Sequence, residues 1–154
     1  MIQLPQSVIN RLIMNCGARR ALEAEDFNPS YSIAPIALVT APELAVQYGS
    51  PDEGCTDEPD TVSPQWLLID MDPETGRVTV LASLGLDYVE LGYIFISEIE
   101  DLGQEVITDL PDFNLLTYWR AAQDMPDKRI TLDPDKLRAA AQALAREALE
   151  AADD

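Results

Sequence analysis

The fold is decided by residues 66–96, which read WLLIDMDPETGRVTVLASLGLDYVELGYIFI. Residues 66–69 form a short apolar run that is typical of a buried strand, and residues 77–81 are rich in the β-branched residues that favour a second strand. Between them, residues 72–76 (DPETG) have the chemistry of a turn, because proline pre-sets φ and glycine tolerates a positive φ. The sequence therefore predicts a hairpin over residues 66–82.

A third strand and a short helix are predicted after this hairpin. Residues 93–96 (YIFI) combine aromatic and β-branched side chains, which favour a strand. Ser97 and Glu100 have the spacing of a capping box, in which the serine oxygen caps the helix start and the glutamate reaches back to the cap. We therefore expect a short helix over residues 98–102 that stops at Gly103.

Helices are also predicted near both ends of the chain. Residues 5–15 carry apolar side chains on one helical face, and Gly17 is a natural C-terminal stop. Residues 110–123 are ambiguous between helix and strand, with helix favoured. Asp133 and Pro134 are a strong helix start, so residues 134–151 should form a long helix. Its apolar stripe is Leu137, Ala141, Leu144 and Ala148.

These elements predict an α+β fold in a single domain, residues 1–154. A small antiparallel sheet, made of the hairpin 66–82 and the strand 93–96, should pack with the N-terminal and C-terminal helices. Residues 36–39 lie among three prolines and are expected to form an edge strand, since proline cannot donate to a sheet ladder. Residues 49–64 should be an acidic loop.

The charge is concentrated in one long section of the chain. The 154 residues hold 28 acidic and 10 basic side chains, for a formal net charge of −18. Residues 21–119 contain 20 acids and a single base, Arg77, whereas residues 1–20 contain three bases and no acid. Repulsion among so many like charges costs stability, which indicates that the negative charge has a function. Docking onto a basic surface is the function that we favour. Solubility is the alternative use.

The composition and motifs exclude several kinds of chemistry. There is no histidine, so histidine-dependent catalysis and His–metal sites are excluded. Cys16 and Cys55 form no C-x-x-C pair, and either one disulfide or two free thiols would suit them. Residues 70–81 fail the spacing of a calcium loop, and we expect no metal or other cofactor. Asp87 and Glu90 could form a carboxylate pair for acid–base work, but close acid pairs are inevitable by chance here. We therefore predict that the protein is not an enzyme.

Two segments resemble a family of small proteins of unknown function that is common on bacterial plasmids and other mobile elements. Residues 66–73 (WLLIDMDP) are similar to its W-L-L-x-E-x-D-P segment, and residues 84–93 (LGLDYVELGY) to its L-G-x-G-x-P-E-L-G-Y segment. The chain departs from that pattern at Asp87, at Val89 and at residues 82–83. The resemblance covers about residues 64–103. It implies a mobile-element context in the bacterial cytoplasm, and no mechanism.

The charge and the resemblance together predict a non-enzymatic inhibitor that binds a partner protein. We expect a counter-defence protein, of the anti-CRISPR or anti-restriction type, that docks on the basic surface of a nucleic-acid-handling protein. It should not bind nucleic acid or membranes itself, because both would repel it. The alternatives are an accessory protein with solubilising charge only and, from another class, a carboxylate-dependent enzyme. The candidate contact residues are Asp52, Glu53, Asp57, Glu58 and Asp60 in the loop, and Asp87, Glu90, Glu98, Glu100 and Asp101 in the sheet region.

Overall fold

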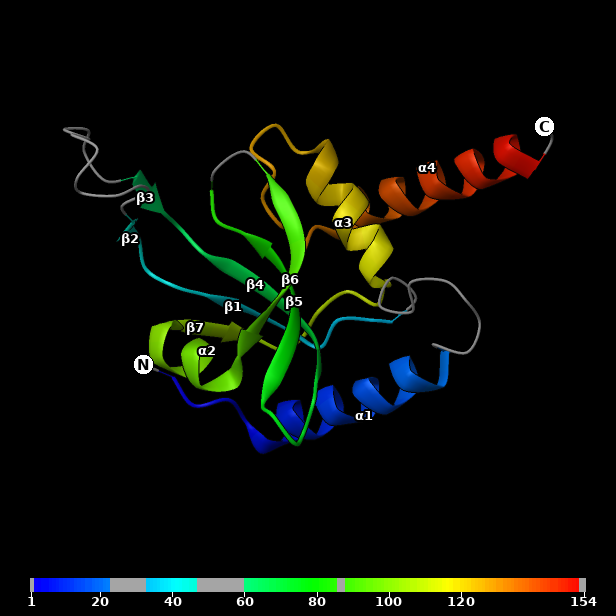
Figure 1. Ribbon diagram of the computed structural model, residues 1–154. Helices are drawn as coiled ribbons and strands as arrows, with labels where there is room; N and C mark the ends of the chain where they lie inside the picture. The colour runs from blue at the N-terminus through cyan, green and yellow to red at the C-terminus, as the bar shows by residue number, and fades with distance from the viewer. Residues whose placement is uncertain (1, 23–32, 47–59, 86–87, 153–154) are drawn as a thin grey trace, which may run out of the picture.

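A computed structural model of the protein describes residues 2–22, 33–46, 60–85 and 88–152 (Figure 1). Its helices are α1 (Gln6–Leu22), α2 (Ile96–Leu102), α3 (Leu115–Asp124) and α4 (Pro134–Ala152). Its strands are β1 (Ala37–Thr40), β2 (Leu44–Val46), β3 (Asp60–Val62), β4 (Gln65–Met71), β5 (Arg77–Ser83), β6 (Val89–Phe95) and β7 (Glu105–Ile107). The predicted α+β class is confirmed.

The main sheet is antiparallel, in the order β6-β5-β4-β1-β7, and a separate ribbon joins β2 to β3. The predicted hairpin is its centre. Gly76 closes the turn with a φ of 74°, and its N–H donates to the carbonyl of Asp72 at 2.9 Å. Both faces of the sheet are covered, so β4 is apolar over nearly its whole length, as in a strand buried on both sides.

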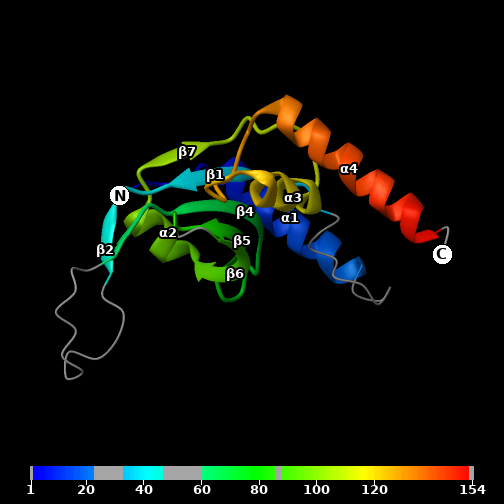
Figure 2. The same cartoon turned by 90° about the horizontal axis from the view of Figure 1, so that it is seen from above.

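Alternate residues of the strands enter two different cores. Leu68 and Val80 pack on the side of α1 and α2, where Leu12 and Ile99 complete the core. The opposite face packs against α3 and the start of α4, in a second core made mainly of Leu38, Leu67, Ile69, Leu81, Leu115, Tyr118 and Leu137. The last turns of α4 project beyond the sheet, and α2 lies at the other end of the molecule in both views (Figures 1 and 2).

Two expectations about helix ends are wrong. Helix α1 does not stop at Gly17 but continues to Leu22, because a glycine only permits a stop and the side chains beyond it find partners on the sheet. The capping box also does not form. Helix α2 begins at Ile96 with Phe95 as N-cap and no side-chain cap, and the Glu100 carboxylate instead accepts a hydrogen bond from the Leu4 N–H at 3.1 Å.

Three strand expectations also need correction. Strand β1 is internal, between β4 and β7, because Pro35 and Pro42 fall just outside it and remove no ladder hydrogen bond. Strand β6 begins at Val89, four residues earlier than expected, and Ile96 belongs to α2. Residues 60–62 of the predicted loop form β3.

The two C-terminal helices follow their sequence signals. The Asn114 side chain caps α3 by accepting from the N–H of Thr117 at 3.0 Å. Tyr118 donates to the carbonyl of Pro111 at 2.6 Å, and burial, with the charge of Asp112, raises the pKa of Tyr118 to about 12. In α4, Leu137 is fully buried, but Ala148 of the predicted stripe is exposed. The stripe therefore packs on the domain only in its first half.

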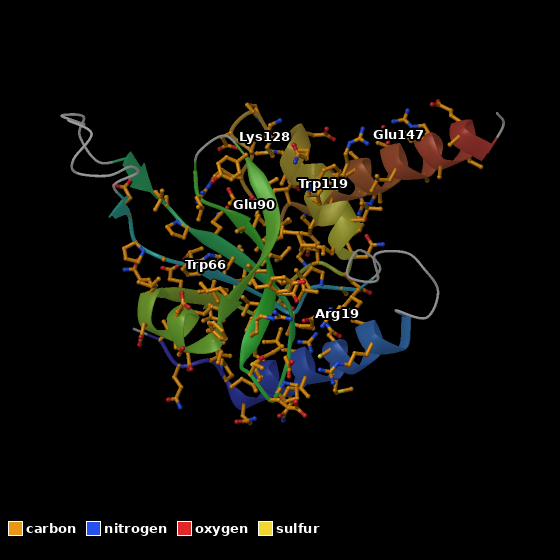
Figure 3. All side chains as sticks on the ribbon, viewed as in Figure 1. Arg19, Trp66, Glu90, Trp119, Lys128 and Glu147 are labelled. Carbon is orange, nitrogen blue, oxygen red and sulfur yellow. The ribbon has the colours of Figure 1, made fainter. Side chains whose placement is uncertain are left out.

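A buried polar network pins the end of α1 to β4. Asp70 is 1% exposed and forms an ion pair with Arg19 at 2.9 Å, while its second oxygen accepts from the Thr79 hydroxyl at 2.7 Å. The register of β4 shifts between Leu68 and Asp70, and the carbonyl of Ile69 at this irregularity accepts from the Asn15 amide at 2.8 Å. Arg19 extends from α1 toward the sheet (Figure 3). The network therefore joins α1 to the central strand.

Gly103 is expected to be intolerant of any side chain. A Cβ there would lie 2.6 Å from the carbonyl oxygen of Ile99 and 2.9 Å from a methyl carbon of Val39. Gly103→Ala should therefore lower the free energy of unfolding by about 2 kcal/mol, as other overpacked sites do. The matched control is Gly17→Ala, which meets nothing within 4 Å in the middle of α1 and should raise stability by about 0.5–1 kcal/mol. Urea unfolding measures the stability of both variants. Equal changes in stability would contradict the claim that close packing at Gly103 excludes a side chain.

Candidate acidic docking face

Four of the candidate contact residues fall within the described part of the chain with their side chains. They are Glu90 on β6 and Glu98, Glu100 and Asp101 on α2, and we call these four residues the acidic face. Asp60 is the first residue of β3. The other candidates lie outside the described residues: Asp52, Glu53, Asp57, Glu58 and Asp87. The alternative that Asp87 and Glu90 form a carboxylate pair is therefore not tested. Cys55 also lies outside the described residues, whereas Cys16 is a buried free thiol in α1.

The acidic face lies on one side of the sheet. Glu90 pairs in register with Ala82, which packs on the core beneath α1 and α2, so its side chain is on the same side as α2. Helix α2 begins where β6 ends, five residues and thus roughly 16 Å of strand beyond Glu90. The carboxylates therefore stand at both ends of one strand rather than in a single cluster. Figure 3 shows Glu90 on β6.

A hollow of about 500 Å³ lies between α2 and the N-terminal segment. Ile2, Gln3, Ser97, Glu100 and Asp101 line it. The backbone N–H of Ile2 donates to the carbonyl of Glu100 at 2.8 Å, so the N-terminal segment is tied to the helix. Asp101 is exposed and Glu100 is half-buried. The apolar side chain of Ile2 beside two carboxylates suits the side chain of lysine or arginine, which combines an aliphatic stem with a charged end.

No described basic side chain forms an ion pair with the acidic face. Arg120 pairs with Glu147 at 2.7 Å, and this hydrogen bond raises the pKa of its guanidinium. Arg129 donates to the backbone carbonyls of Ser63 and Ser83, and burial lowers its pKa. Other described contacts of basic side chains are also elsewhere, among them Arg19–Asp70, Arg20–Asp72, Arg138–Asp135 and Arg77 over the ring of Tyr93. Within the part of the chain that the structure describes, no basic side chain therefore neutralises the acidic face.

The N-terminal arginines have a role that the sequence reasoning missed. The positive first 20 residues and the acidic section after them were treated as separate features. In the structure, Arg19 and Arg20 of α1 pair with Asp70 and Asp72 at the end of β4. The opposite charges of the two segments indicate that they could form ion pairs. Which residues pair depends on how α1 crosses the sheet, and the sequence does not show this.

Comparison with protein-family models, curated proteins and solved structures finds no match. The resemblance to the mobile-element family therefore remains an expectation from the quoted residues. Within the described ranges, no group of three or more acidic or cysteine side chains is placed to hold a metal ion. None of the described helices is long and apolar enough to cross a membrane.

The chemistry available at this face is electrostatic recognition. Glu98 and Asp101 lie on a helix whose packing residue, Ile99, is fully buried, so their positions are held before any partner arrives. Charge held in place loses less entropy on binding than charge on a mobile chain. The face therefore suits a partner that presents lysine or arginine side chains on a surface of its own.

Proposed function

We propose that the protein is a non-enzymatic inhibitor that docks its acidic face on the basic, nucleic-acid-binding surface of a partner protein. It competes there with nucleic acid, as a counter-defence protein of a mobile element in the bacterial cytoplasm. The resemblance of residues 66–73 and 84–93 to a mobile-element family supports the context. The charge supports the choice of partner, because basic surfaces in cells mostly belong to proteins that bind nucleic acid.

One observation carries this proposal: the exposed carboxylates of Glu90, Glu98 and Asp101 have no described counter-charge. Residues 88–119 contain seven acids and no base. Solubilising charge needs no particular placement, but here the acids are held on a strand and a helix of the sheet domain. Such a surface attracts a basic partner over about 8–10 Å at physiological salt, and it speeds their association.

The experiment that tests the proposal is capture of the partner from a nuclease-treated bacterial extract at low salt. The immobilised wild-type protein should retain a nucleic-acid-handling protein that elutes with rising salt and is released by added nucleic acid. A matched column should carry the variant Glu90→Gln/Glu98→Gln/Asp101→Asn, which keeps shape but lacks three charges. Equal capture on both columns, or a captured protein that nucleic acid does not release, would refute the proposal.

A further inference from the structure

The outer edge of β6 carries a row of backbone groups that face away from the sheet. The N–H of Ile96 donates to the carbonyl of Gly76 at 2.8 Å, which makes this pair a hydrogen-bonded one. Hydrogen-bonded and non-hydrogen-bonded pairs alternate along an antiparallel ladder. In the register of β5 and β6, the N–H groups that point outward therefore belong to Val89, Leu91, Tyr93 and Phe95. The outward C=O groups belong to Val89, Leu91 and Tyr93, because the carbonyl of Phe95, the N-cap of α2, accepts the first hydrogen bond of that helix.

A second hydrogen bond gives the same assignment. The carbonyl of Arg77, which lies opposite Phe95, accepts from the N–H of Asp72 on the far side of β5. It is therefore directed toward β4, not toward β6. Strand β6 is the last strand of the described sheet on this side, so no described strand pairs with the outward N–H and C=O of Tyr93 or with the outward N–H of Phe95.

This edge lacks the usual features that prevent strands from pairing. Natural edges are short, or carry lysine, proline or a bulge. The opposite edge strand, β7, fits that description with three residues, but β6 has seven, with no proline or lysine and an unbroken register. It also exposes aromatic rings: Tyr93 is 61% and Phe95 is 47% exposed. A long, regular edge of this kind, with Glu90 as its one charged side chain, is a template for another strand.

The two sides of such an added strand would meet different surfaces. Tyr93 and Phe95 alternate with Ile94, so their rings lie on the sheet face opposite α2. Arg77 already stacks on Tyr93 with its guanidinium 4.4 Å from the ring centre. On the α2 side, Glu90 stands at one end of β6 and Glu98 follows the other end. The complementary strand is thus apolar on one side and basic on the other.

We propose that the partner adds an extended segment of alternating basic and apolar residues to the outer edge of β6, as a sixth strand of the main sheet. Its basic side chains face Glu90 and Glu98, and its apolar side chains cover Tyr93 and Phe95. The basic character of the segment rests on the proposed function, whereas the strand pairing rests on the edge itself. A second copy of this chain is a poor occupant, because each copy carries a net charge of −18.

The test uses the full-length protein and a synthetic eight-residue peptide in which lysine alternates with valine. The variant Phe95→Pro removes one outward N–H and no ladder bond, and the φ of −76° at Phe95 suits proline. The matched control, Phe95→Ala, removes the ring but keeps the N–H. Calorimetry should show that Phe95→Pro weakens peptide binding at least tenfold and Phe95→Ala no more than threefold. A peptide with the same residues in two blocks should bind at least tenfold more weakly than the alternating one.

Amide hydrogen exchange of the wild-type protein gives an answer even if Phe95→Pro fails to fold. The N–H groups of Leu91, Tyr93 and Phe95 should exchange rapidly in the free protein and slow at least tenfold with the alternating peptide. Rapid exchange that the peptide leaves unchanged, slow exchange in the free protein, or equal binding by the two Phe95 variants would overturn strand addition. If Phe95→Pro keeps the captured partner and the acidic-face variant loses it, the proposed function stands without this inference.

Discussion

Replacing Arg19 with methionine is expected to lower the free energy of unfolding by about 3–5 kcal/mol. The reason is Asp70, which is 1% exposed and would remain in the core without the guanidinium that lies 2.9 Å away. Methionine keeps much of the length of the arginine side chain and removes its charge. A buried carboxylate that loses its partner is far more costly than a pair that is replaced as a whole.

The neighbouring residue provides the control. Arg20 pairs with Asp72 at 3.6 Å, and the two side chains are 54% and 21% exposed, so Arg20→Met should cost less than about 1 kcal/mol. Adding Asp70→Asn to Arg19→Met should restore a large part of the lost stability, because the amide can still accept from Thr79 without a buried charge. Urea unfolding of the wild type and these three variants measures the differences in stability. Similar losses for Arg19→Met and Arg20→Met would show that the buried pair does not hold α1 to β4.

Local signals predicted the elements whose stabilising contacts are local. In the hairpin, the turn residues and the two flanking apolar runs predict the same structure. In α4, the start signal of Asp133 and Pro134 coincides with the beginning of the apolar stripe. The failures have a common origin in contacts between distant segments. Glu100 has the right spacing for a capping box, yet its carboxylate binds Leu4, 96 residues away. No pattern within ten residues could have revealed that partner.

The sequence predicted that the sheet-region acids are held on rigid elements, but not which of them share a surface. Glu90, Glu98 and Asp101 belong to a section of the chain without bases, and the structure places them on one side of the sheet, along β6 and α2. Among 28 acids, nothing in the sequence distinguished Asp70, which is buried and paired, from these exposed ones. The burial of Asp70 depends on how α1 packs against the sheet. That packing also decides which carboxylates form a structural ion pair and which stay exposed to solvent.

Neutralising the acidic face is expected to weaken partner binding about 100-fold. The variant is Glu90→Gln/Glu98→Gln/Asp101→Asn, and each lost charge should contribute on the order of 1 kcal/mol. Glu100 is left unchanged because its carboxylate holds the N-terminal segment through Leu4. The loop acids Asp52, Glu53 and Asp57, changed in the same way, should matter less, since the acidic face is held on a strand and a helix.

The most direct measurement is therefore the dissociation constant of the captured partner, taken at several salt concentrations for three folded proteins. They are the wild type, the acidic-face variant and a control with Glu150→Gln/Asp153→Asn/Asp154→Asn. The control removes the same charge from Glu150, in the last turn of α4, and from the two residues that follow this helix in the sequence. The last turn of α4 lies on the opposite side of the molecule from α2 (Figures 1 and 2). Our account predicts a steep salt dependence for the wild type and the control, and a 100-fold weaker, flatter dependence for the acidic-face variant. If all three proteins bound the partner with equal affinity and equal salt dependence, our account would be contradicted. The negative charge of the chain would then serve solubility only.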